Sequence, residues 1–187
     1  MRLGLRACAV VLLVLGFAGL QLAAKRFVMP RPLDAGSYPA HDEHPLENVA
    51  IAVDPYDTGQ KASVFSAHYL EKNLLPMLFV VSNRGGEPVE LSGMRLQLVL
   101  RDRTKIGPAD EGDLYRRFTR TPRNTGISRL PLPLPIPLGG ETGAPKELHD
   151  ELQVSQFRAR EVEPGATESG FFFFDVSGTR KPLAGAH

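Results

Sequence analysis

The sequence of 187 residues predicts a mainly β protein: an antiparallel β-sandwich with one or two short helices and a long proline-rich loop, preceded by an N-terminal transmembrane or signal helix. Three observations lead to this fold class. Several short segments alternate apolar and polar residues, as half-buried strands do. Turn-forming residues separate these segments without a regular strand-helix alternation, which favours antiparallel sheets. One long apolar run stands at the N-terminus.

The N-terminal run Ala7–Ala24 contains no charged residue and has basic residues on both sides. Such a run directs a chain across a membrane, so we expect residues 27–187 outside the cytoplasm. Two interpretations stay open. One is a signal peptide cleaved near Gly16-Phe17-Ala18, which gives a secreted or periplasmic protein, and the other is an uncleaved anchor in the cell membrane. We favour the anchor, because Lys25 and Arg26 follow where a cleavage region is small and polar.

The cysteine content and the net charge argue against several kinds of site and partner. Cys8 is the only cysteine and belongs to the leader, so no disulfide or cysteine metal cluster is expected in residues 27–187. The first 26 residues hold four of the 22 basic residues and none of the 21 acidic ones, which leaves a net charge near −3 on the rest. This mild negative charge argues against nucleic acid as a partner.

Composition divides the chain into four parts. Residues 1–26 are the signal peptide or signal-anchor helix, and residues 27–45, rich in Pro, Gly and Ala, are expected to form a flexible tether. Residues 46–177 are the β-sandwich domain, with a proline-rich inserted loop at 119–143. Residues 178–187 are expected to be a disordered tail.

The first strands are predicted from apolar periodicity. Residues Val49–Val53 alternate and end at Asp54-Pro55, and residues 74–82 are almost continuously apolar, as in a strand buried on both faces. Residues 83–86 then supply turn chemistry. The clearest period of two lies in residues 94–101, which we expect to form a strand with one face inward.

The last strand is expected over residues Phe171–Val176, after a turn at Glu163-Pro164-Gly165. Phe171 and Phe173 would lie on one face of this strand, and Phe172 and Phe174 on the other. Its aromatic content makes it a strong core candidate.

Two short helices are predicted between these strands. Pro108 and Pro145 can each begin a helix, because a proline at the first helical position loses no hydrogen bond. Apolar residues four apart would then share one helix face. The pairs are Leu114 with Phe118 and Leu148 with Leu152.

The loop between these helices contains the alternating prolines of Pro131–Pro137. Every second residue there lacks an amide hydrogen, so the segment is expected to be extended polyproline II rather than an interior strand. It either covers a sheet edge or serves as a docking ligand for an aromatic-lined groove.

Four short motifs together resemble a known family. They are Phe79–Gly85, the strand that ends at Arg101-Asp102, the Glu163–Gly165 turn and Gly170–Val176. In this order they resemble the telokin-like, immunoglobulin-type domain of bacterial secreted proteins and lipoproteins, over roughly Val49 to Val176. The resemblance implies an immunoglobulin-like sandwich and an envelope binding or accessory module, and it transfers no catalytic residue. The chain departs from the pattern in lacking a lipobox and in its long loop.

Catalytic, cofactor and metal sites are not predicted. The stretch His41–His44 offers possible metal ligands, but neighbouring side chains on an extended segment diverge and no second cluster completes a site. Ser66, His68 and Asp57 could be arranged as a triad, yet no G-x-S-x-G motif accompanies them. We therefore expect no enzyme activity, no cofactor and no metal.

A partner-binding surface is the remaining candidate. It could consist of exposed aromatic residues on the last strand, apolar residues of the proline-rich loop and nearby arginines. Each group also has a structural alternative: the aromatic residues could belong to the core, the loop could cover a sheet edge, and the arginines could be solvated surface residues. The residues are Phe172, Phe174, Leu132, Leu134, Ile136, Arg116 and Arg117.

These observations favour an extracytoplasmic binding or accessory module of the cell envelope, held in the membrane through residues 7–24 and contacting an envelope protein. Two alternatives stay open. One is a hydrolase with its site near the long loop, for which His68 or His149 would be needed, and the other is a passive structural domain of the envelope. The oligomeric state does not follow from the sequence.

Overall fold

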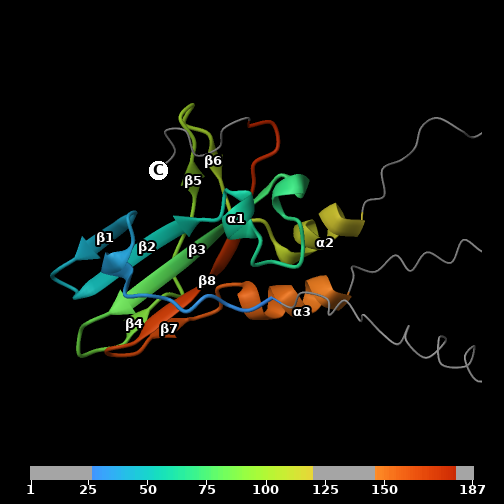
Figure 1. Ribbon diagram of the computed structural model, residues 1–187. Helices are drawn as coiled ribbons and strands as arrows, with labels where there is room; N and C mark the ends of the chain where they lie inside the picture. The colour runs from blue at the N-terminus through green and yellow to red at the C-terminus, as the bar shows by residue number, and fades with distance from the viewer. Residues whose placement is uncertain (1–26, 120–145, 180–187) are drawn as a thin grey trace, which may run out of the picture.

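The computed structural model describes residues 27–119 and 146–179 (Figure 1). Within them the chain is mainly β, with antiparallel sheets and few helices, as the sequence predicts. The leader at residues 1–26 lies outside the described residues. So do residues 120–145, which hold most of the proline-rich loop, and residues 180–187 of the tail.

A four-stranded antiparallel sheet is the centre of the fold. Its order is β1 (His41–His44), β2 (Val49–Pro55), β3 (Leu74–Asn83) and β8 (Thr167–Asp175). All residues of β3 are buried, which confirms the prediction of a strand covered on both faces. Strand β2 ends at the predicted Asp54-Pro55. The phenylalanines of β8 alternate between the two faces of the sheet, as predicted.

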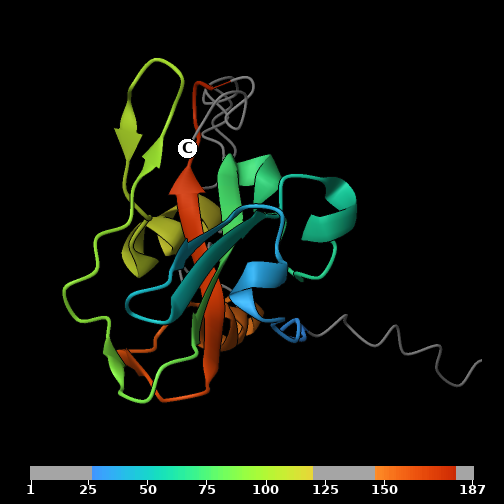
Figure 2. The same cartoon turned by 90° about the vertical axis from the view of Figure 1, so that its left-hand side faces the viewer.

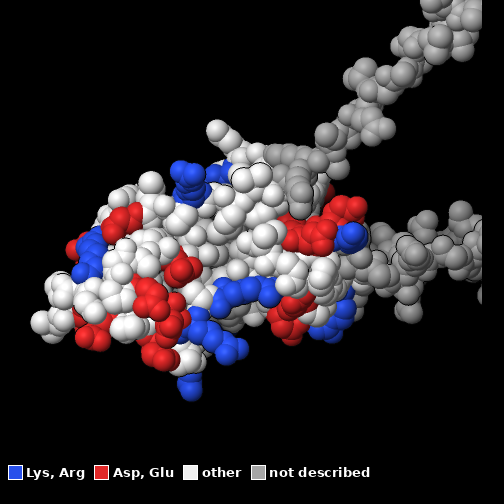
Figure 3. Space-filling model, turned by 90° about the horizontal axis from the view of Figure 1, so that it is seen from below, with Lys and Arg blue, Asp and Glu red and all other residues white. Residues whose placement is uncertain are grey.

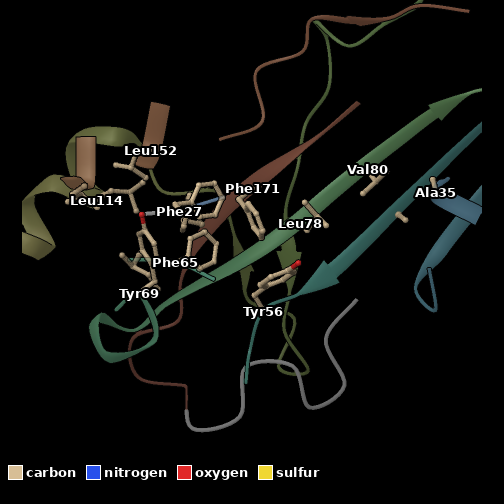
Figure 4. Close-up of a cluster of buried hydrophobic side chains, with 14 of the residues drawn as sticks. Phe27, Ala35, Tyr56, Phe65, Tyr69, Leu78, Val80, Leu114, Leu152 and Phe171 are labelled. Carbon is tan, nitrogen blue, oxygen red and sulfur yellow. The ribbon is translucent and has the colours of Figure 1, made fainter. Parts of the chain in front are cut away.

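Helices cover one face of this sheet. Leu114 of α2 (Glu111–Thr119) and Leu148 and Leu152 of α3 (Lys146–Ser155) pack with Phe171 and Phe173 of β8 in the largest core cluster. Figure 4 shows Leu114 and Leu152 at one end of this cluster and Val80 and Ala35 toward the other. The predicted pairs Leu114 with Phe118 and Leu148 with Leu152 do share their helix faces.

The opposite face of the sheet is covered by residues 89–106 and by the short strand at residues 161–162 (Figure 2). Two short antiparallel pairs lie here. They are β4 (Val89–Glu90) with β7 (Glu161–Val162), and β5 (Leu98–Val99) with β6 (Lys105–Ile106). The sheet is therefore enclosed on both faces, by helices on one and by short strands on the other.

The turn residues of the sequence make the connections that were predicted. Asn83 is buried, and its side chain donates to the carbonyls of Glu87 and Val162 and accepts from the N–H of Gly85. It thereby satisfies backbone groups that the end of β3 would leave unpaired. After β7, the Ala166 N–H donates to the Glu163 carbonyl at 3.0 Å, while Gly165 has φ +72°. A proline followed by a positive-φ glycine is typical of a type II turn.

The prediction of a flexible tether over residues 27–45 is wrong for this segment. Phe27 is buried and its ring stacks on Phe65 at 5.2 Å between centroids. Ala35 is fully buried, and its N–H donates to the Ser82 hydroxyl at 2.9 Å. Residues 35–37 form the short 3₁₀ helix η1 (Ala35–Ser37), and residues 41–44 add β1 to the sheet. A few residues attach the segment to the core through contacts with residues distant in the sequence. The composition of the segment does not reveal these contacts.

The strand expected over residues 94–101 is mostly wrong. Only Leu98 and Val99 belong to a strand, and Met94 is exposed. The inward residues of the alternation do contact the core, since Leu96 and Leu100 pack with the cluster under Phe174. Alternation therefore reports which side chains are buried, while a strand also needs a partner for its backbone.

Helix α2 begins at Glu111, three residues after the predicted start. Pro108 instead forms an isolated bridge with Phe174 at the edge of β8. The Asp110 carboxylate accepts from the Asp113 N–H at 2.7 Å, which is how an N-terminal capping residue satisfies a free amide of the first turn. Helix α3 begins at Lys146, and the predicted Pro145 lies outside the described residues.

Candidate functional site

A groove of about 690 Å³ lies within the described residues, on the helix-bearing side of the domain. The segment 59–71 lines nearly all of it, and Glu147 at the start of α3 completes the wall. This segment contains α1 (Gly59–Ala62) and the 3₁₀ helix η2 (Leu70–Lys72). Its apolar residues form most of the groove surface, while His68, Glu71 and Glu147 supply a polar rim.

Two aromatic anchors hold the groove-forming segment onto the sheet. Phe65 and Tyr69 are buried, 5.0 Å apart between ring centroids, and both contact Phe173. The Thr58 hydroxyl caps α1 by accepting from the Lys61 N–H. The groove is therefore formed by a loop that is fixed at its centre by the core.

A buried carboxylate supports the back of the groove. Glu151 of α3 is only 3% exposed, and it accepts from the N–H groups of Ser66 at 2.5 Å and Ala67 at 3.4 Å. Burying a carboxylate is costly unless such donors are supplied. The Tyr69 hydroxyl lies beside Glu151 without a hydrogen bond of normal geometry. Burial, and then the negative charge of Glu151, raise the pKa of Tyr69, so its hydroxyl is neutral at physiological pH.

Glu151→Ala is expected to loosen the groove by leaving the Ser66 and Ala67 amides without their acceptor. Because a hydrogen bond to a charged group contributes about 1.5–3 kcal/mol, the domain should lose stability in about that range. Amide hydrogen exchange measures this directly, as faster exchange at residues 66 and 67. Glu147→Ala, on the exposed side of the same helix, is the matched control and should leave both amides protected. Unchanged exchange in the Glu151 variant would contradict the supporting role.

The aromatic residues predicted for a partner surface belong mainly to the core. Phe174 is 1% exposed, so the prediction that it lies on an exposed patch is wrong. Phe172 is half-buried, and its ring packs against Phe79 and Phe157 at 5.7 and 5.6 Å between centroids. The segment 89–106 covers this face of β8, which leaves little of it for a partner.

The two predicted arginines have different surroundings. Arg117 forms an ion pair with Asp175 and donates to the Lys72 carbonyl at 3.1 Å and the Ser177 hydroxyl at 3.0 Å, so it ties α2 to the end of β8. Burial alone would raise the pKa of Asp175, but hydrogen bonds from Ser177 and the charge of Arg117 outweigh it and lower the pKa. Arg116 is exposed and pairs with a neighbour on its own helix. The loop residues Leu132, Leu134 and Ile136 lie outside the described residues.

Charges on the surface seen from below are interspersed, with acidic and basic side chains close together (Figure 3). One exposed cluster joins three parts of the fold. Arg84, after β3, pairs with Asp34 before η1 and with Glu43 of β1, the latter at 3.1 Å. The hydrogen bond from Arg84 lowers the pKa of Asp34 despite an opposing effect of burial. The cluster fastens the N-terminal segment to the sheet.

The residues considered for metal binding or catalysis are engaged in local pairs. His44 contacts Asp42 at 3.4 Å across one face of β1, and the residues that the structure describes contain no group of three or more potential ligands arranged to hold a metal ion. His68 Nδ1 lies 3.0 Å from Oε1 of Glu71, so Glu71 is a partner of this imidazole. The Ser66 backbone is held by Glu151.

A cluster that the sequence analysis missed joins α2 to α3. The Tyr115 hydroxyl donates to Glu111 at 2.7 Å and lies 2.6 Å from His149 Nδ1, with the two rings stacked at 6.1 Å. Burial, and then the hydrogen bond to Glu111, raise the pKa of Tyr115 to about 12, so it stays a donor at neutral pH. His149 thus contributes to helix packing. Tyr115 and His149 lie 34 residues apart, and nothing local in the sequence links them.

Within residues 27–119 and 146–179, no helix combines the length and the apolar character needed to cross a bilayer. The span predicted from Ala7–Ala24 lies outside these residues. Comparison of the chain with known protein family models, with curated proteins and with solved structures finds no match.

Proposed function

We propose that this protein is a binding or accessory module of the cell envelope, held in the membrane by residues 7–24 with its domain on the extracytoplasmic side. The observation that carries the proposal is the uncharged run Ala7–Ala24 with basic residues at both ends, followed by a folded domain. Cleavage after this run would give the same module in secreted form. No catalytic role is proposed.

The groove lined by segment 59–71 is the binding site in this proposal. Pockets that bind ligands are concave and mostly apolar with a few polar groups for orientation, and the groove has this composition. Its partner in this proposal is an envelope protein that places an apolar side chain in the groove, whose polar lining residues include His68 and Glu147. The short antiparallel pairs β4–β7 and β5–β6, which cover one face of the four-stranded sheet, support the immunoglobulin-type sandwich that the sequence motifs imply, and we propose it as the finer fold class.

Site-specific photo-cross-linking in intact cells tests the proposal. A photoreactive phenylalanine at position 68 lies at the groove, whereas the same group at Glu90 lies on the exposed face of β4. We expect an adduct of one size from position 68 in the membrane fraction and none from position 90. The domain should also be digested by protease added to spheroplasts but not to intact cells. Identical adduct patterns at both positions, or no adduct at position 68, would contradict the binding role.

A further inference from the structure

The junction between the predicted membrane anchor and the domain is very short. Lys25 and Arg26 alone separate the uncharged run from Phe27. Phe27 is 7% exposed, stacks on Phe65 and contacts the edge of Phe171 at 6.4 Å between centroids. The first described residue is therefore already fixed in the hydrophobic core, and the fold leaves no room for a flexible spacer.

Chain length then limits how far the domain can stand from the bilayer. The chain from Ala24 to Phe27 reaches at most about 11 Å when fully extended. The headgroup layer on each side of the hydrocarbon core is roughly 5–7 Å thick. The backbone of Phe27 must lie within or just above that layer when Ala24 is at its inner edge.

We propose that the surface around Phe27 and Val28 rests directly on the phospholipid headgroups, so that the domain has a fixed orientation on the bilayer. This inference rests on the membrane anchor proposed above. Val28 supports it, because this apolar residue is 75% exposed next to the buried Phe27. In the sequence, Lys25 and Arg26 directly follow the uncharged run, and basic residues beside a membrane span can pair with lipid phosphates.

The path of the N-terminal segment defines which end of the domain faces away. From Phe27, beside Leu152 and Phe65, the chain runs to Ala35 near Val80 (Figure 4). It then enters the β1–β2 hairpin, whose turn carries Leu46 with 94% exposure. In Figure 1 this hairpin lies at the end of the domain opposite α2 and α3. Leu46 is thus expected far from the bilayer, and Leu33 comes between Val28 and Leu46 along the chain.

Depth-dependent fluorescence quenching tests this orientation on the full-length protein. In a Cys8→Ser background, the variants Val28→Cys, Leu33→Cys and Leu46→Cys each carry one environment-sensitive fluorophore; all three sites are exposed. The proteins are reconstituted in vesicles of phosphatidylcholine and phosphatidylglycerol that contain a lipid with a nitroxide on its headgroup. We expect quenching several-fold stronger at position 28 than at position 46, with position 33 intermediate.

A second set of variants separates the possible failures. Insertion of a glycine-serine segment between Arg26 and Phe27 should keep the protein in floated vesicles while removing the difference between the labelled positions. A protein that fails to float with the vesicles would overturn the anchor and this inference together. A protein that floats but shows equal quenching at positions 28 and 46 without the insertion would overturn the fixed orientation alone.

Discussion

Replacing Gly170 with alanine is expected to destabilise the domain by about 3 kcal/mol or more, because overpacking against backbone atoms cannot be relieved by a side-chain rotation. An added Cβ would lie 2.3 Å from the Phe157 Cα and 2.4 Å from its nitrogen. Strand β8 would have to move away from residues 156 and 157, which breaks the bond from the Phe157 N–H to the Phe171 carbonyl at 3.2 Å. Urea denaturation measures the loss as a lower midpoint.

Gly107→Ala is the matched control for this substitution. Gly107 is exposed, and a Cβ there would meet no atom within 4 Å. Its free energy of unfolding should be unchanged or slightly higher, since alanine restricts the unfolded chain. Equal midpoints for the two variants would show that β8 does not depend on the close approach at Gly170.

Phe171→Ala is expected to cost about 3–5 kcal/mol, the range for removing a fully buried phenylalanine. Phe171 is 1% exposed at the centre of an aromatic cluster, 4.8 Å from both Tyr56 and Phe65 between ring centroids. Its loss would also remove an edge contact to Phe27, and so weaken the attachment of the N-terminal segment. Urea denaturation monitored by the fluorescence of the tyrosines measures the loss.

Phe172→Ala on the same strand is the control, because it removes the same atoms from the opposite and less buried face. It should cost clearly less than Phe171→Ala in the same measurement. A greater loss from the Phe172 variant would mean that the face under residues 89–106 is the main core of the domain.

The long strands were predictable because the residues of each strand are themselves apolar, and this local pattern indicates burial. Residues 74–82 are apolar almost throughout, and the phenylalanines of 171–174 fill both faces of β8. Residues 94–101 show the limit of this method: their alternation identified Leu98 and Leu100 as buried, but it also included the exposed Met94 and could not reveal whether a backbone partner exists. The prediction of a flexible tether over residues 27–45 was wrong for a related reason, because Phe27 and Ala35 are held by contacts with residues far along the chain.

The groove was not predictable, although one local sign of it is present. Glu151 falls on the same helical stripe as Leu148, Leu152 and Ser155, at the i, i+3, i+4 and i+7 spacing of a buried face. A carboxylate on such a stripe needs hydrogen-bond donors, which here are the backbone amides of Ser66 and Ala67. The identity of those donors depends on tertiary packing, and the sequence around Glu151 does not contain it.

The pairing of β3 with β8 has a consequence for how the protein reaches its native state. Ser82 and Thr167 meet across 85 residues of chain, and this ladder joins the longest strand to the final one. Contacts between such distant residues slow folding, because a large loop must close before they can form. The four-stranded sheet therefore cannot be completed during synthesis until residue 175 of β8 has left the ribosome.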